Sequence, residues 1–255
     1  RRSDQTRDAT VKGEIIHYTR DALGGILVVD YRKHRVMTFD SVFEQSKIDR
    51  RRPHLPVHEY SRAMLLPVAF AQPAHATILG LGGGVMASAL LHLLPDCQVH
   101  AVELRPRVLE VAREYFSLPH SDNLTMTIGD ARDALGKAPD GSSDLILADM
   151  YNSDRMSPAQ AQRQFIRQCS RVLGDDGWLA INYHRTPDIN GPLFHQLRAG
   201  FAVLLLFKSK TNNTVIFASK RPFEALHTKD PSLVALENRL PIDWRRLMGR
   251  VIRLN

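Results

Sequence analysis

The sequence has few of the features that mark secreted, membrane-spanning or redox proteins. Its 255 residues include only two cysteines, Cys97 and Cys169, which lie far apart and form no CxxC pair or metal-ligand spacing. We expect both to be reduced, which favours a cytoplasmic location. The longest apolar stretches, such as residues 202–207, are too short to span a bilayer. No signal-peptide pattern is recognisable, although the chain begins with Arg1 rather than Met.

Motifs of several other enzyme classes are also missing. The chain contains no G-x-S-x-G sequence, so nothing supports Ser-His-Asp catalysis. His54 and His58 have the i, i+4 spacing of some metal ligands, but Pro56 between them interrupts a helix. We therefore expect no metal site.

Positive charge is in excess, with a net charge of +7. The basic residues gather at positions 1–7, 49–52 and 244–253. A basic balance can indicate a polyanionic partner, but no aromatic-rich basic stripe or nucleic-acid motif accompanies this one. We expect a solvated basic surface, with neither nucleic acid nor membrane as a partner.

The order of apolar runs divides the chain into two parts. Residues 1–57 contain short strand candidates and a proline-bounded linker, which predicts a small N-terminal β element. Residues 58–255 begin with a helical pattern at 59–72 and then alternate strands with helices. That alternation predicts an α/β fold with a mostly parallel sheet, and the runs at 201–207 and 214–218 predict an antiparallel hairpin at its end. Further strands are expected at residues 14–18, 26–30, 35–39, 77–81, 98–102, 124–128, 144–148 and 177–182, and helices at 85–94, 105–116 and 158–173.

A glycine cluster lies between the first two strands of this alternating part. The first apolar run leads into Gly80, Gly82, Gly83 and Gly84, and the second ends on Glu103. Glycines allow a ligand to approach the backbone closely, and a carboxylate about 20 residues later can accept hydrogen bonds from both hydroxyls of a ribose. The order strand, glycine turn, helix, strand, acid therefore predicts a nucleoside-binding site.

Polar residues also follow the next three strands. Asp130, Asp149 and Asn182 each stand at or just beyond a predicted strand end. Ligands of open α/β sheets bind beyond the carboxyl ends of the strands. A single acid at such a position is often a helix cap, and both roles stay open for Asp130. Together with Glu103, the acids Asp130 and Asp149 follow three consecutive strands, which favours a binding site over three separate caps.

Four segments resemble the spermidine synthase (polyamine aminopropyltransferase) family, in a divergent branch. They are AVELRPRVLEVAREYFSLP at 101–119, IGDARDAL at 128–135, DLILADMY at 144–151 and LGDDGWLAIN at 173–182. The resemblance covers nearly the whole chain. It implies the Rossmann-like sheet of the class I S-adenosylmethionine-dependent methyltransferase superfamily, preceded by a small N-terminal β element, and often a homodimer.

The resemblance further implies a transferase of polyamine biosynthesis. Such an enzyme moves an aminopropyl group from decarboxylated S-adenosylmethionine to a small amine or polyamine, without a metal. Asp149 would be the catalytic acid that orients or deprotonates the amine. For Gln45 and Tyr60, a role in packing alone stays open as an equal alternative to ligand binding. The implied donor-binding residues are Gly80, Gly82, Gly84, Glu103, Asp130, Ala131 and Gln45, and the implied substrate-binding residues are Tyr60, Tyr151 and Asn152.

The sequence departs from the family pattern at the amine-binding positions. Gly83 and Asn152 stand where the family has acids, and Asn182 stands where it has a glutamine. Two charges that would pair with ammonium groups are therefore missing, which weakens polyamine binding. Two alternatives follow: a methyltransferase that uses intact S-adenosylmethionine on a small acceptor, and a nucleoside-binding protein without turnover.

Overall fold

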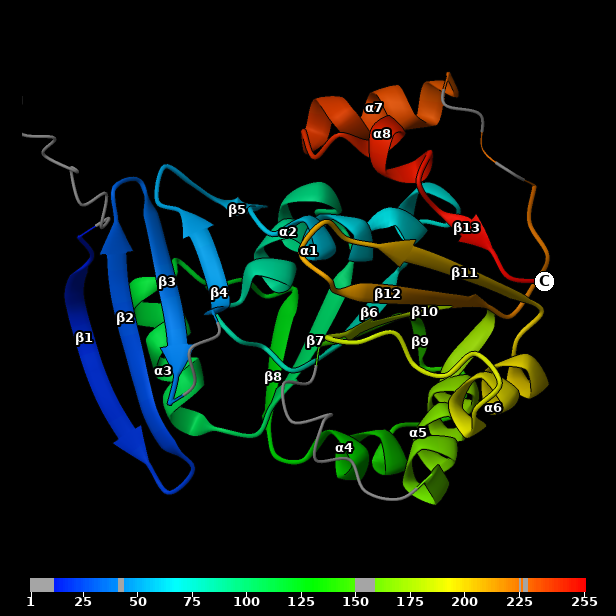
Figure 1. The fold of residues 1–255 in the computed structure, drawn as a ribbon, viewed down its shortest axis with the longest axis horizontal. Coiled ribbons are helices and arrows are strands. Elements are labelled where there is room, and N and C mark those ends of the chain that lie inside the picture. Colours follow the sequence, from blue (N-terminus) through cyan, green and yellow to red (C-terminus); the bar gives the residue numbers. More distant parts are fainter. Residues whose placement is uncertain (1–11, 41–43, 150–158, 225, 227–228) are drawn as a thin grey trace, which may run out of the picture.

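In the described residues, the N-terminal part of the protein is a five-stranded antiparallel sheet. The computed structural model describes residues 12–40, 44–149, 159–224, 226 and 229–255. Neighbouring strands of this sheet follow one another along the chain (Figure 1). They are β1 (Glu14–Asp21), β2 (Gly24–Tyr31), β3 (His34–Phe39), β4 (Glu44–Asp49) and β5 (Arg52–Pro56).

One expectation for this part was wrong. Residues 52–56 are not a linker but the strand β5, which pairs with β4. β5 is an edge strand, and an edge tolerates Pro53 and Pro56 because one side of the strand needs no hydrogen-bond donor.

The larger sheet is mixed and has the order β13-β11-β12-β10-β9-β6-β7-β8 in the described part of the chain. The run from β10 to β8 is parallel, whereas β12, β11 and β13 are added antiparallel. This confirms the expected Rossmann-like sheet with a terminal antiparallel hairpin. Its strands are β6 (His75–Leu79), β7 (Gln98–Glu103), β8 (Leu124–Ile128), β9 (Ser143–Ala148), β10 (Leu173–Tyr183), β11 (Val203–Lys208), β12 (Thr214–Ser219) and β13 (Ile252–Arg253).

Helices cover both faces of the larger sheet. In Figure 1, α7 and α8 lie on the side of α1 and α2, and α4, α5 and α6 lie on the opposite side. The helix expected over residues 59–72 is interrupted, because α1 ends at Met64 and a 3₁₀ turn with Pro67 follows. The helices are α1 (Glu59–Met64), η1 (Leu66–Ala69), α2 (Val85–Leu93), α3 (Pro106–Tyr115), α4 (Ala131–Lys137), α5 (Ala159–Val172), α6 (Pro192–Gly200), α7 (Pro231–Arg239) and α8 (Trp244–Met248).

Helix α3 joins the two sheets. Its Leu109 and Ala112 belong to the main core, while Val108 and Val111 pack with residues of the N-terminal sheet. The guanidinium of Arg35 on β3 donates to the carbonyl of Tyr115 at 3.0 Å. The N-terminal sheet is therefore packed against the large sheet through this helix.

Both cysteines are buried and free. Burial raises the pKa of the Cys97 thiol to about 11, so it stays protonated at neutral pH. Of the helices in the described ranges, none has the length and apolar character needed to cross a bilayer.

Candidate functional site

The glycine loop connects the carboxyl end of β6 to α2. Gly80, Gly82 and Gly84 have φ values of 91°, 54° and 81°, a left-handed region that favours glycine. Gly84 is the N-terminal cap of α2. The loop thus brings glycine backbone and the N-terminus of α2 to the edge where nucleotide phosphates or other polar ligand groups bind in such folds.

Glu103 ends β7 and is bonded to this loop. One carboxylate oxygen accepts from the N–H groups of Leu81 (3.2 Å) and Gly82 (3.4 Å), and the other accepts from the Arg105 N–H (2.9 Å). Burial raises the pKa of Glu103, and these three N–H groups oppose that rise. The carboxylate is held in one orientation, and its second oxygen keeps acceptor capacity for a ligand hydroxyl.

Arg105 connects this acid to the N-terminal sheet. Its buried guanidinium donates to both carboxylate oxygens of Asp21, at 2.8 and 2.9 Å, and to the carbonyl of Gly24 at 3.0 Å. The turn between β1 and β2 is therefore bound next to Glu103.

Asp130 caps α4. Its Oδ1 accepts from the N–H groups of Arg132 (2.8 Å) and Asp133 (3.3 Å), and Ala131 is the first residue of the helix. Of the two roles left open by the sequence, the cap is therefore present. The N–H of Gly129 donates to the Glu103 carbonyl at 2.9 Å, so this end of β8 adjoins the end of β7.

Asp149 follows β9 and contacts residues of three other elements, β6, β10 and α1. Its N–H donates to the Leu79 carbonyl at 3.0 Å, next to the start of the glycine loop. Its Oδ1 accepts from Asn182 Nδ2 at 3.1 Å, and its carboxylate also accepts a hydrogen bond from Tyr60. Burial raises the pKa of Asp149, while Asn182, His184 and Tyr60 act in the opposite direction. The arrangement is a buried carboxylate with three polar neighbours, as general acid-base groups often have.

Gly83, which stands where the family has an acid, is surrounded by other side chains. The N–H of Gly83 donates to Ser46 Oγ on β4 at 2.7 Å. A Cβ at position 83 would lie 2.9 Å from the Ser46 Cβ and 3.0 Å from Phe116 Cδ1. Gly83 is thus enclosed by the N-terminal sheet and α3, and a larger residue there requires its neighbours to move.

Three expected site residues lie wholly or partly outside the described residues. Tyr151 and Asn152 lie outside the described residues, and for Gln45 only the backbone position in β4 is described. The structure brings the remaining ones to one edge of the large sheet. They are Gly80, Gly82, Gly84, Glu103, Asp130, Ala131, Asp149 and Tyr60.

Two residues near the site were not found from the sequence. Ser46 contacts the glycine loop, and the buried Asn213 donates through Nδ2 to Asn182 Oδ1 at 3.2 Å. No sequence signal pointed to either, because each comes from an element far along the chain from its partner.

The histidines at 54 and 58 stack on different rings. His54 stacks on His92 with ring centroids 4.1 Å apart, and His58 stacks on Tyr60 at 5.4 Å. Burial lowers the pKa of His54. Within the described ranges, no three His, Cys, Asp or Glu side chains gather in a way that could hold a metal ion.

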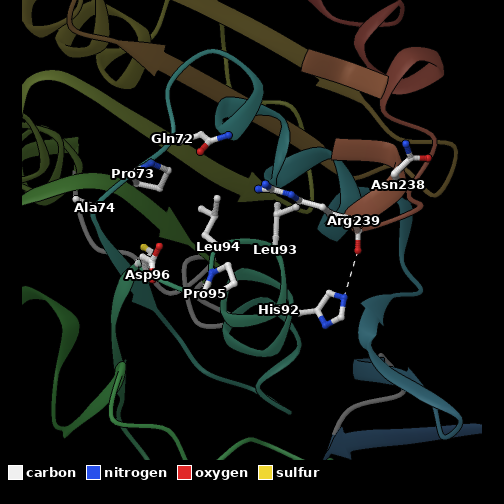
Figure 2. Close-up of a pocket in the computed structure, with 11 residues that line it drawn as sticks. Gln72, Pro73, Ala74, His92, Leu93, Leu94, Pro95, Asp96, Asn238 and Arg239 are labelled. Carbon is white, nitrogen blue, oxygen red and sulfur yellow. Dashed lines mark hydrogen bonds between the residues drawn. The ribbon is translucent and has the colours of Figure 1, made fainter. Parts of the chain in front are cut away.

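A cavity lies elsewhere in the structure. Figure 2 shows it between the residues that precede β6, the end of α2 and the end of α7, with His92 bonded to the Arg239 carbonyl at 3.2 Å. Its volume is about 800 Å³. It adjoins the amino ends of β6 and β7, whereas Glu103 and Asp149 stand at the carboxyl ends, and none of the expected site residues lines it.

Comparison with known proteins indicates the class of the domain. Residues 78–177 match the model of the "Methyltransferase domain" family, in agreement with the fold. A probable spermidine synthase from Corynebacterium glutamicum has a similar structure, with a TM-score of 0.71 and 19% identity over 90% of this chain and 87% of that one. The domain indicates the S-adenosylmethionine-dependent methyltransferase superfamily.

Sequence relatives fall into two named groups of enzymes. The chain is 32% identical over 142 residues to the polyamine aminopropyltransferase of Neisseria meningitidis serogroup B, which covers 54% of each protein. It thus matches about half the length of that relative. It is also 27% identical over 192 residues to the mouse eEF1A lysine and N-terminal methyltransferase, covering 68% of this chain and 27% of that protein. The resemblance to polyamine aminopropyltransferases inferred from the sequence is confirmed.

Proposed function

We propose that the protein is a spermidine-synthase-like transferase that moves an aminopropyl group from decarboxylated S-adenosylmethionine to an amine acceptor, a reaction of polyamine biosynthesis. The observation that carries the proposal is the contact of Asp149 with Tyr60 and Asn182, beside a glycine loop bonded to Glu103. Both groups of sequence relatives bear the names of group-transferring enzymes, which supports a transferase.

The residues present fit a nucleoside donor. Glu103 is oriented by backbone N–H groups and has an oxygen with spare acceptor capacity, as binding of ribose hydroxyls requires. Gly80, Gly82 and Gly84 leave room for close approach, with left-handed backbone that other residues adopt rarely. In the proposal Asp130 and Ala131 contact the adenine and Gln45 contacts the nucleoside.

The chemistry at Asp149 follows from its surroundings. The donor, when bound, supplies a carbon activated by the neighbouring sulfonium. An ammonium group is not a nucleophile, so the site must hold the acceptor as a neutral amine. The Asp149 carboxylate accepts a proton from the amine nitrogen or orients it, and the raised pKa makes this carboxylate a stronger base than an exposed aspartate. Tyr60 lies against the same carboxylate and would contact the acceptor. Proximity of the two reactants supplies much of the rate.

A second candidate is methyl transfer from intact S-adenosylmethionine. The enclosure of Gly83 by Ser46 and Phe116 favours it, because an acid that would bind the aminopropyl amine is absent and has no space. The mouse methyltransferase among the relatives also supports it.

Several further features belong to the proposal. Tyr151 and Asn152 would line the acceptor side. We expect a cytoplasmic homodimer in which residues 1–57 form the N-terminal element and residues 58–255 the catalytic domain.

One experiment separates the candidates. The purified protein is incubated with either sulfonium donor and a panel of amines, and products are identified by mass spectrometry. Methylthioadenosine supports aminopropyl transfer, and adenosylhomocysteine supports methyl transfer. Donor binding without either product contradicts both and leaves a nucleoside-binding protein.

A further inference from the structure

The tip of the β11–β12 hairpin is tied to α1 and to the C-terminal segment at one point. The N–H of Lys210 donates to Glu59 Oε1 at 2.9 Å. Arg250, just beyond α8, places Nη1 3.0 Å from Glu59 Oε2, and its Nη2 donates to the Lys208 carbonyl at 2.7 Å. A single carboxylate and a single guanidinium thus connect three segments that are far apart in sequence.

Helix α1 and the hairpin tip each carry a residue linked to Asp149, the first directly and the second through Asn182. Tyr60 is adjacent to Glu59 and bonds directly to the Asp149 carboxylate. Asn213 belongs to the hairpin tip and bonds to Asn182, which bonds to Asp149. The tip itself is closed by Ser209, whose N–H donates to the Asn213 carbonyl at 2.8 Å and whose Oγ accepts from the Asn213 N–H at 3.1 Å.

Asn213 also determines which way Asn182 faces. It donates to the Asn182 carbonyl oxygen, so the amide nitrogen of Asn182 is directed to Asp149. If the Asn182 amide were turned over, its oxygen would face the Asp149 carboxylate and the hydrogen bond between them would be lost.

The tie between Glu59 and Arg250 is charged and largely shielded. Their side chains are 22% and 29% exposed, and the guanidinium lies 4.6 Å from the centre of the Phe207 ring. Burial acts to raise the pKa of Glu59, but the Arg250 guanidinium and the Lys210 N–H outweigh it and leave that pKa lowered. The ion pair therefore persists at neutral pH, and the planar guanidinium contacts carboxylate and carbonyl together.

We propose that Arg250 is a positioning residue for Asp149, acting through Glu59 and the hairpin tip to hold Tyr60 and Asn213 in place. The proposal rests on the proposed function, since it gives Asp149 the central role. It also assigns a use to one residue of the basic C-terminal stretch. Arg250 touches neither Asp149 nor the expected donor site.

The test compares Arg250→Met, which keeps the apolar stem, with Arg250→Lys and with the control Arg246→Met. Arg246 is exposed on the neighbouring helix α8. We expect Arg250→Met to lower kcat by about tenfold to a hundredfold, with the Kd for methylthioadenosine unchanged. Arg250→Lys restores part of the loss, and Arg246→Met behaves as wild type. Equal kcat in Arg250→Met and wild type overturns the proposal.

A second readout does not depend on turnover. The described groups that face Asp149 are Tyr60 from α1, and Asn182 and His184 from the end of β10, and all three favour its ionised form. Loss of the Tyr60 and Asn182 bonds should move the titration of the ¹³C-labelled Asp149 carboxyl to higher pH, with Asp149→Asn used to assign the signal. If wild type shows no group transfer but the titration moves, the proposed function fails and the positioning role stands. An unchanged titration in folded Arg250→Met rejects the positioning role.

If Arg250→Met does not fold, Asn213→Ala takes its place. It breaks the link to Asn182 without removing the ion pair. The same upward shift is expected, and its absence contradicts the argument.

Discussion

At the scale of single residues, Asp149 combines its proposed chemical role with a cost to the fold. The raised pKa means that the protonated carboxyl suits the folded state better than the ionised one. The protonated Asp149 contributes to the stability of the fold below pH 3.8, the ordinary aspartate pKa. This contribution is lost as the pH rises through the pKa of Asp149 in the folded protein. In its ionised form the buried side chain therefore opposes folding.

The substitution Asp149→Asn separates the two effects. We expect kcat to fall by about 10²–10⁴-fold because the proton acceptor is gone. We also expect the free energy of unfolding at neutral pH to rise by about 0.5–2 kcal/mol, as at other active-site residues that are costly to the fold. Steady-state kinetics and urea unfolding measure both. Full turnover in the variant would remove Asp149 from the mechanism, whatever its stability.

The same carboxylate predicts the pH dependence of the wild type. Activity should rise with pH along an acid limb whose midpoint lies above 3.8, since Asp149 must lose its proton to act. A kcat profile under saturating substrates measures it. A midpoint at or below the ordinary aspartate value would mean that another group controls the limb.

Gly83 offers a test of close packing. Gly83→Ala brings a Cβ to 2.9 Å from the Ser46 Cβ, and we expect a loss of about 1–3 kcal/mol in unfolding free energy. In the background of Ser46→Gly the same change should cost less, with a coupling of about 0.5 kcal/mol or more in a double-mutant cycle. Urea unfolding of the four proteins gives the coupling. Additive effects would mean that Ser46 does not enclose position 83.

At the scale of elements, the parts recognised from the sequence are those with strong local patterns. Strands β6 to β9 and helix α3 follow clear apolar periodicity, and the hairpin β11–β12 follows from two runs with a short connection. β5 was missed because prolines are read as breakers unless the strand is known to be at an edge. The short strand β13 depends on pairing with β11, which local patterns do not reveal.

Packing of the N-terminal sheet predicts an acid sensitivity. Arg35 donates to both Asp30 oxygens, at 2.7 and 3.0 Å, and Arg50 adds a third bond at 3.1 Å. The Arg35 guanidinium holds the pKa of Asp30 below its usual value. The stabilisation is present above the unfolded value of 3.8 and is lost as the pH falls through the lower folded pKa.

Asp30→Asn measures that contribution. Because Asp30 is 9% exposed and its loss leaves a half-buried guanidinium unpaired, we expect about 1–3 kcal/mol less stability at neutral pH. The difference from wild type should shrink on acidification below the usual aspartate range. Urea unfolding at neutral and acidic pH tests this, with Asp140→Asn, whose ion pair with Arg171 is exposed, as the control. A difference that does not change with pH would contradict the linkage.

At the scale of the whole molecule, the expected binding site draws residues from both sheets. The acids could be expected from the sequence because parallel strands bring their carboxyl ends to one edge. Ser46 and Asn213 could not, since their partners at 83 and 182 are separated from them by entire elements. The enclosure of Gly83 likewise depends on how the N-terminal sheet packs and not on the glycine itself.

Donor binding should therefore stabilise the entire fold. Methylthioadenosine at about 100 times its Kd should add about 2.7 kcal/mol to the free energy of unfolding and raise Tm. Glu103→Ala should abolish the shift because the bound ribose loses its acceptor. Thermal unfolding with and without the nucleoside measures this, with Asp149→Asn as a variant expected to keep the shift. A shift that survives in Glu103→Ala would place the nucleoside elsewhere.

The contact between Ser46 and Gly83 restricts the order in which this sequence can change over evolution. An acid introduced at position 83 alone meets Ser46 and Phe116 before it can meet any ligand. A lineage that gained polyamine affinity by that route would first need a smaller residue at 46 or a movement of α3. The proposed amine preference is thus linked to a strand of the N-terminal sheet, and positions 46 and 83 are expected to covary among its descendants.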